Sequence, residues 1–157
     1  MTFQYAPAPE STAIVNINSS NDLFINGEFT PGHGNPFKTI NPATEEVLAE
    51  IAHANEEDVN AAVMAARKAY DKTWSKMSGR DRGKYLFRIA RLIQERSREL
   101  AVLETLDNGK PIRESRDVDV PIAAAHFFYH AGWADKLEFA GYGDNPRPLG
   151  VVAQVIP

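Results

Sequence analysis

The chain has 157 residues, enough for one ordinary domain, with a hydrophobic fraction of 43% and a charged fraction of 24%. Its net charge of −4 disfavours nucleic acid as a partner, because binding to phosphates needs a basic surface. The sequence has no cysteine, which excludes disulfides, cysteine-ligated metals and a cysteine nucleophile within this chain. It has no apolar run of about 20 residues to span a membrane, and no secretory signal, so we expect a cytoplasmic protein.

The N-terminal segment, residues 1–21, shows no helical periodicity. Its run Ala6-Pro7-Ala8-Pro9 is stiff and extended, because proline fixes its own φ and restricts the residue before it. We predict an extended N-terminal arm laid over the surface of the folded unit, which would comprise residues 22–157. A frayed terminus is the alternative interpretation of the arm.

Short strands are predicted next. Asn26-Gly27 is typical of a tight type I′ turn, and it predicts a hairpin between strands at 23–25 and 28–30. After a loop rich in proline and glycine, residues 37–40 and 47–51 read as two further strands. These segments predict small β hairpins in the N-terminal third of the chain.

Four helices should follow. The first begins after Asn55, which with Asp58 resembles a capping arrangement, and the second spans about 79–96 after the N-cap Ser78. The third spans about 98–107 and ends at Gly109, predicted to be a left-handed cap. The fourth begins near Ser115 or Val118, runs to about Lys136, and carries Pro121 in or near its first turn.

The final run, Val151 to Ile156, is almost continuously apolar and β-branched, which is typical of a strand buried on both faces of a parallel sheet. Such a sheet needs neighbouring strands and crossover helices, and the sequence offers no second strand of this type. Two interpretations follow. Either the polypeptide was cut at the entry to a larger α/β domain, or this strand pairs with another chain.

No complete active site is evident from motifs. His126 and His130 share one helix face, as in zinc helices, but no third ligand is suggested and packed or hydrogen-bonded histidines are the simpler interpretation. The carboxylates of Glu114, Asp117 and Asp119 suit the positive end of a helix dipole. Neither phosphate-binding glycine fingerprint occurs.

Five segments resemble, in order, the NAD(P)-dependent aldehyde dehydrogenases. They are similar to that family's INGE, NPATGEV, ETLDNGKP, AGWADK and PVGVVGQIIP motifs, and they lie at residues 23–29, 39–47, 103–111, 131–136 and 148–157. Glu45 stands where glycine is usual. Between Lys136 and Pro148 the chain is also shorter than many members, which use that stretch in a strand pair for oligomer assembly.

The resemblance implies an N-terminal segment that ends just before the family's Trp-Asn-Phe-Pro motif. The parent would have the α/β aldehyde dehydrogenase fold. This chain would be an α+β portion of it, the incomplete N-terminal part of the cofactor-binding domain, with hairpins, about four helices and one strand of an otherwise missing parallel sheet. The parent would oxidise an aldehyde with NAD or NADP through a cysteine thioester, and this chain alone would carry no catalytic residue and bind no cofactor.

The resemblance also suggests individual site residues. Val155, Ile156 and Pro157 match a strand end that approaches the cofactor. Ile122 matches an apolar residue of the substrate tunnel. Ile40 and Asp107 match positions whose backbone carbonyls help to hold a monovalent cation.

Two other hypotheses remain open from the sequence. The chain could be a natural short, non-catalytic interaction or assembly module, with the final strand forming a homo-oligomer or recruiting another partner by edge pairing. A helical scaffold, whose family motifs serve packing alone, is the weaker alternative. No membrane partner is expected.

Overall fold

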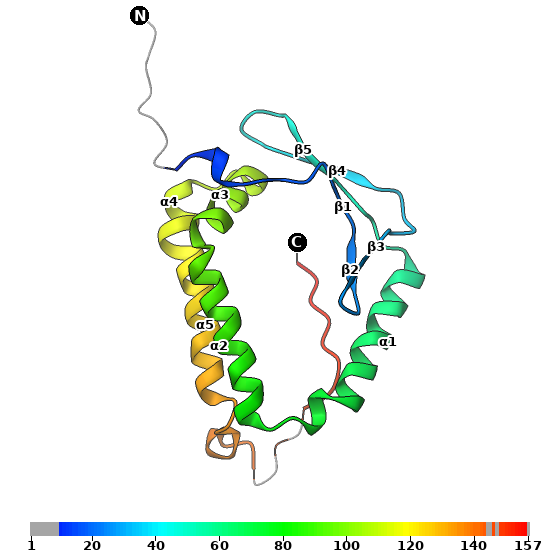
Figure 1. The fold of residues 1–157 in the computed structure, drawn as a ribbon, viewed down its shortest axis with the longest axis vertical. Coiled ribbons are helices and arrows are strands. Elements are labelled where there is room, and N and C mark those ends of the chain that lie inside the picture. Colours follow the sequence, from blue (N-terminus) through cyan, green and yellow to red (C-terminus); the bar gives the residue numbers. More distant parts are fainter. Residues whose placement is uncertain (1–9, 144–145, 147, 157) are drawn as a thin grey trace, which may run out of the picture.

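The computed structural model of the chain describes residues 10–143, 146 and 148–156. Within them, Figure 1 shows strands at one end of an open ring, with helices along both sides. In chain order the principal elements are η1 (Thr12–Ile14), β1 (Ser20–Asn21), β2 (Leu23–Ile25), β3 (Glu28–Thr30), β4 (Phe37–Ile40), β5 (Val47–Ile51), α1 (Glu56–Lys72), η2 (Trp74–Lys76), α2 (Gly79–Glu95), α3 (Ser97–Asn108), α4 (Ile112–Glu114), η3 (Ser115–Asp119), α5 (Val120–Trp133) and η4 (Leu137–Ala140).

The predicted hairpin is confirmed. Strands β2 and β3 pair antiparallel, and the two turn residues between them have positive φ angles, 57° at Asn26 and 88° at Gly27. A type I′ turn requires positive φ at both central residues, which asparagine and glycine tolerate best. The local sequence therefore determines this turn and the register of its strands.

A second sheet has the strand order β1-β5-β4. Strand β4 pairs antiparallel with β5, as two consecutive strands with a short connection can, whereas β1 pairs parallel with β5 through Ser20 and Asn21. The predicted arm therefore ends within a sheet. Residues 1–9, including its proline-rich part, lie outside the described residues.

The first helix has the predicted start. The side chain of Asn55 accepts a hydrogen bond from the backbone N–H of Asp58, and the carboxylate of Asp58 accepts one from the N–H of Asn55. This reciprocal capping box satisfies donors that have no partner inside the helix. Asp58 also accepts from His33, so the cap attaches the β3–β4 loop to α1.

Helices α2 and α5 form the main packed pair, and small residues lie where they meet. Gly83, Ala90, Ala124 and Ala131 are all buried, and Ala90 is fully so. The ring of Phe87 lies 5.9 Å from that of Phe128, centroid to centroid, beside this contact. Small side chains let the two backbones approach, and the aromatic pair fills the adjacent space.

The fourth helix is more complex than predicted. The short turn α4 and the π-helical segment η3 precede α5, which ends at Trp133 rather than Lys136. Pro121 lies in the first turn of α5, as expected. Because Pro121 has no N–H to offer the carbonyl four residues earlier, the preceding turn is free to widen.

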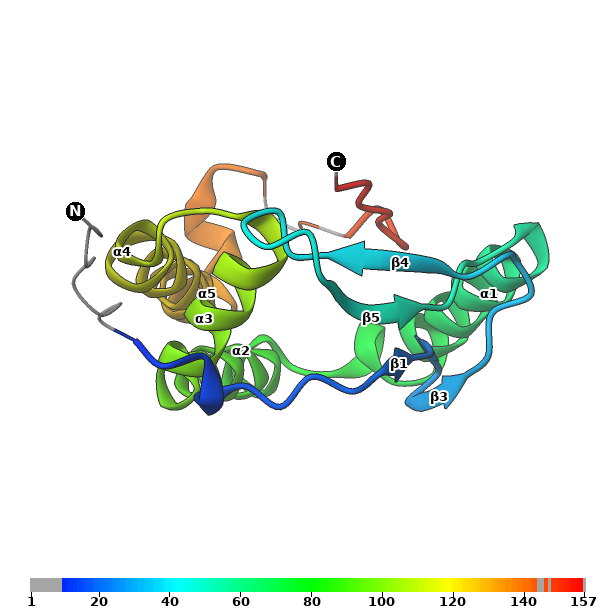
Figure 2. The same cartoon turned by 90° about the horizontal axis from the view of Figure 1, so that it is seen from above.

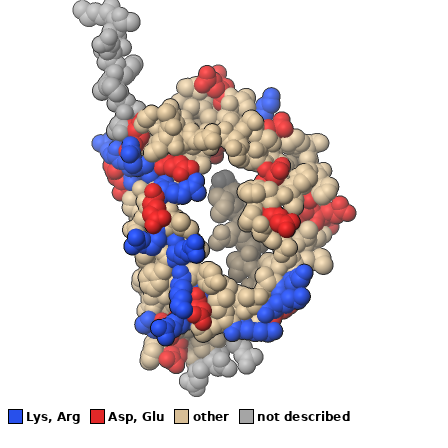
Figure 3. Space-filling view, viewed as in Figure 1, with Lys and Arg blue, Asp and Glu red and all other residues tan. Residues whose placement is uncertain are grey.

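The predicted final strand does not form. Residues 151–156 have no regular structure, and Val152, Val155 and Ile156 are 78%, 94% and 81% exposed. A strand forms only where a neighbouring strand pairs with it, and none of the described strands is hydrogen-bonded to this segment. The segment runs through the centre of the ring in Figure 1 and to one side of the strands in Figure 2. The space-filling view shows that a gap remains open between the two sides of the ring (Figure 3).

Candidate functional site

A large hollow lies between the three-stranded sheet and the helices α2, α3 and α5. It has a volume of about 670 Å³ and draws its lining from four parts of the chain that are far apart in the sequence. Residues 15–18 of the N-terminal segment form one wall. The opposite walls comprise strand residues Thr39, Leu48, Ala49 and Ile51 and helix residues such as Ile93, Leu100, Leu103 and Asp107.

Asp107, one of the two cation candidates, lines this cavity, and the other, Ile40, directly follows the lining residue Thr39. Thr39 donates its hydroxyl hydrogen to the carboxylate of Asp107, a contact across 68 residues of sequence that brings the end of β4 to the last turn of α3. The β4–β5 register shifts between Thr39 and Ile40. The last carbonyl groups of a helix have no hydrogen-bond partner inside the helix, and a shift in strand register can leave strand carbonyl groups unpaired. Both α3 and β4 can therefore offer backbone oxygen atoms here.

A second hollow, of about 430 Å³, runs along the outer face of α5. It is lined by Ile122, the substrate-tunnel candidate, which is 50% exposed, together with Ala125, His126, Tyr129 and His130. Sequence analysis did not assign His126 and Tyr129 to this site. Their spacing from Ile122 could have indicated it, because residues at i, i+4 and i+7 lie on one face of a helix.

One histidine of this face has a hydrogen-bonded side chain. His130 donates from Nδ1 to the backbone carbonyl of His126 at 2.8 Å, which confirms the hydrogen-bonded interpretation of this residue. This bond leaves Nε2 as the other ring nitrogen, free to accept when the ring is neutral. In the described part of the chain, no group of three or more histidine, aspartate or glutamate side chains could hold a metal ion.

Two of the three carboxylates before α5, those of Asp117 and Asp119, have basic partners. Asp119 accepts a hydrogen bond from Lys110 at 2.5 Å, and Glu104 lies 3.4 Å from the same Nζ atom. The hydrogen bond to Asp119 is the main reason that the pKa of Lys110 is raised. Asp117 pairs with Arg116. These contacts make Asp117 and Asp119 part of a structural charge network around the α3–α5 corner.

The cofactor candidates do not form an enclosed site. Val155 and Ile156 line neither of the hollows described above, and Pro157 lies outside the described residues. A dinucleotide site needs a concave, largely preformed surface with a few directed polar groups. The described residues of this segment therefore do not by themselves fit NAD or NADP.

Comparison with known proteins decides the family. The sequence model of the "Aldehyde dehydrogenase family" matches residues 29–157. The chain belongs to the aldehyde dehydrogenase family. It is 44% identical over 149 residues to aldehyde dehydrogenase family 2 member B4, mitochondrial, of Arabidopsis thaliana, and this match covers 88% of the chain. It is 42% identical over 151 residues to the putative aldehyde dehydrogenase DhaS of Bacillus subtilis, covering 90% of the chain.

The solved structures agree. The NAD+ complex of the aldehyde dehydrogenase from Bacillus cereus superposes with a TM-score of 0.74 at 44% identity, covering 77% of this chain and 25% of that one. The chain spans only 28% and 30% of the length of the two relatives named above. The fold is thus part of the aldehyde dehydrogenase fold, as the resemblance implied.

None of the helices in the described residues is both long and apolar enough to cross a membrane.

Proposed function

We propose that this chain is the N-terminal segment of an aldehyde dehydrogenase that oxidises an aldehyde to a carboxylic acid, with NAD or NADP as electron acceptor. The observation that carries the proposal is the family match over residues 29–157, together with 44% identity to a member solved with NAD+.

The nucleophile would come from elsewhere in the complete protein, because this sequence contains no cysteine. A cysteine thiolate would attack the aldehyde carbonyl, the resulting adduct would be oxidised to a thioester, and water would release the acid. NAD or NADP, when bound, would accept the hydride. By this account the isolated chain is inactive.

The roles of individual residues follow from the same hypothesis. Ile122 would contact the aldehyde in the substrate tunnel, and its position in a hollow on the outer face of α5 supports this role. His126 and Tyr129 share that hollow and would contact the same substrate. An aldehyde could lie along this helix face because its lining is chiefly apolar and aromatic.

Two further ligand roles belong to the complete protein. The backbone carbonyls of Ile40 and Asp107 would help to hold a monovalent cation, and the Thr39–Asp107 contact supports this pairing of elements. Val155, Ile156 and Pro157 would approach the cofactor once neighbouring strands order them. The exposure of Val155 and Ile156 is consistent with a segment whose partners are not in this chain.

A second candidate is a natural short product that acts as a non-catalytic interaction or assembly module. Leu149, Val152, Val155 and Ile156 are at least 78% exposed, and such a run could pair with a second copy to form a homo-oligomer. A cytoplasmic location is proposed for either form.

The intact mass of the protein in its natural source separates the two candidates. An antibody to this chain should detect a product several times heavier than 17.4 kDa, since the chain spans under a third of its relatives. That product should oxidise aldehydes with NAD or NADP. Detection of a 17.4 kDa product alone would favour the assembly module.

A further inference from the structure

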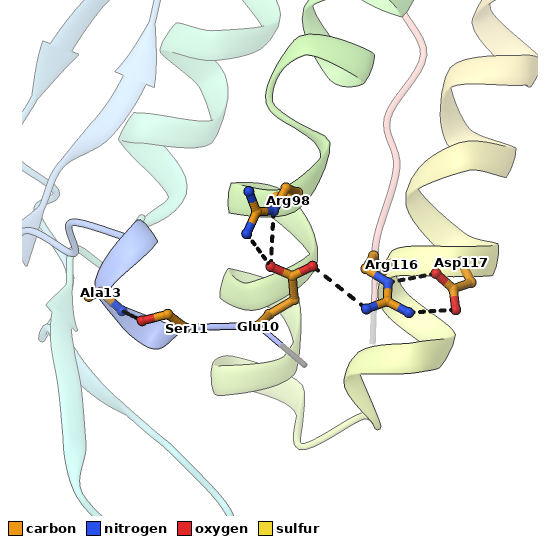
Figure 4. Close-up of polar contacts among 6 residues, drawn as sticks. All are labelled: Glu10, Ser11, Ala13, Arg98, Arg116 and Asp117. Atoms are coloured by element: carbon orange, nitrogen blue, oxygen red, sulfur yellow. Dashed lines mark hydrogen bonds and ion pairs between the residues drawn. The ribbon is translucent and has the colours of Figure 1, made fainter. Parts of the chain in front are cut away.

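The carboxylate of Glu10 is buried between two arginines. Its Oε2 accepts hydrogen bonds from Nε and Nη2 of Arg98, at 3.0 and 2.8 Å, and its Oε1 lies 3.6 Å from Nη1 of Arg116 (Figure 4). The Glu10 side chain is only 8% exposed, although it belongs to the N-terminal segment. A planar guanidinium that meets a carboxylate oxygen with two N–H groups is a strong, directional contact.

Arg116 is oriented for this contact by its neighbour. It donates from Nε and Nη2 to the two carboxylate oxygens of Asp117, at 2.6 and 2.9 Å, so that Nη1 is the group that faces Glu10. Arg98 lies on α3 and Arg116 on the π-helical segment η3. We call Arg98 and Arg116 the arginine clamp. It joins the N-terminal segment to two helical elements at once.

Beyond Glu10 the segment contacts α3 through η1, and Val15 and Ile17 are half-buried before the chain reaches the sheet. Ser11 caps the short turn η1, whose three residues are all exposed. Residues 15–18 then cross the large cavity as one of its walls, and the chain enters β1, which is only two residues long. Glu10 and β1 therefore fasten the two ends of a strap, residues 10–21, over the cavity.

We propose that this strap is a releasable cover, with Glu10 as the latch: loss of the Glu10–arginine contact frees residues 10–18 and opens the cavity between the sheet and the helices. The charged end of the strap responds to salt because Arg98, the main partner of Glu10, is 64% exposed, and salt weakens exposed ion pairs. The backbone hydrogen bonds of β1 weaken much less. This inference does not depend on the proposed dehydrogenase activity.

Hydrogen–deuterium exchange of the purified full-length protein tests the latch. In Glu10→Gln, which keeps the size of the side chain but removes its charge, the hydrogen-bonded amides of residues 13–15 should exchange roughly threefold faster. Exchange in α2 should stay unchanged. The matched control, Glu28→Gln on the β2–β3 hairpin, should leave residues 13–15 as in the parent.

Salt and a second variant complete the test. Raising ionic strength should accelerate exchange at residues 13–15 in the parent protein but not further in Glu10→Gln. Arg98→Gln should reproduce the effect, and combining it with Glu10→Gln should add little, because each removes the same contact. Equal exchange of parent and Glu10→Gln, or strap amides that exchange freely in the parent, would overturn the proposal.

Discussion

Gly109 ends α3 with a φ of 79°, a left-handed conformation that side chains other than glycine adopt at a cost. A Cβ atom added there would also lie 2.6 Å from Cγ of Pro42. We therefore expect Gly109→Ala to lower the free energy of unfolding by about 2 kcal/mol, from the left-handed backbone and the Pro42 clash together. Urea denaturation measures this difference.

Gly132 supplies the control for that experiment. It lies in the last turn of α5 with nothing within 4 Å of an added Cβ, so Gly132→Ala should raise the free energy of unfolding by up to about 0.5 kcal/mol. The opposite signs of the two changes separate backbone strain from a general effect of adding a methyl group. Equal effects at both positions would contradict the argument.

The contact between His33 and Asp58 predicts a pH dependence. Backbone N–H donation by His33 and Asn55, with the His33 side chain, lowers the pKa of Asp58 to about 2. A lowered carboxyl pKa contributes stability above its unfolded value, about 3.9, that is lost as pH falls through the folded pKa. The hydrogen bond with Asp58 raises the pKa of His33. The stability that His33 contributes is therefore fully present below about pH 6.5 and is lost as the pH rises through the pKa of His33 in the folded protein.

The combined contribution should therefore be greatest between about pH 4 and 6.5. Thermal unfolding across pH 3–9 should show a Tm decline above pH 6.5 that is smaller in His33→Gln. His126→Gln, on the outer face of α5, is the matched control. The same decline in His33→Gln as in the parent protein would refute the assigned role of this pair.

At the scale of elements, the α2–α5 contact depends on small side chains. Ala90 is fully buried, and a larger residue there must displace the facing helix or adopt a strained rotamer. Ala90→Leu should therefore lower the free energy of unfolding by about 1–3 kcal/mol in chemical denaturation.

The control for this substitution is Ala61→Leu on the exposed face of α1, where a longer side chain meets solvent. It should change the free energy of unfolding by no more than about 0.5 kcal/mol. If Ala90→Leu were as neutral as Ala61→Leu, the helix pair would be more loosely packed than the burial of Ala90 indicates.

At the scale of the whole molecule, the exposed apolar run at residues 149–156 is the dominant feature. Leu149 and Val155 are 104% and 94% exposed, and contiguous apolar surface of this kind promotes association. We expect the isolated 157-residue chain to self-associate and to bind an apolar dye, as light scattering and dye fluorescence would report. A monodisperse, dye-free monomer would contradict this expectation.

The same chain should show no saturable binding of NAD+ in calorimetry, because Val155 and Ile156 do not form an enclosed site. The control is the complete parent protein, which should bind NAD+ saturably under identical conditions. Tight binding by the isolated chain would show that its cofactor site is complete without further sequence.

The sequence by itself determined the local structure: the Asn26-Gly27 turn, the Asn55 cap and the Gly109 helix end. Each depends on backbone preferences and hydrogen bonds within a few residues, which local sequence encodes directly. It also identified the family, because several short segments match in order.

Only the tertiary structure decided the contacts between distant segments. Glu10 meets Arg98 across 88 residues, and Thr39 meets Asp107 across 68, because the packing of whole elements brings them together. The final run has the composition of a buried strand, yet residues 151–156 form none. The composition of a segment gives it a preference for the strand conformation. A strand forms only where a neighbouring strand accepts and donates its backbone hydrogen bonds.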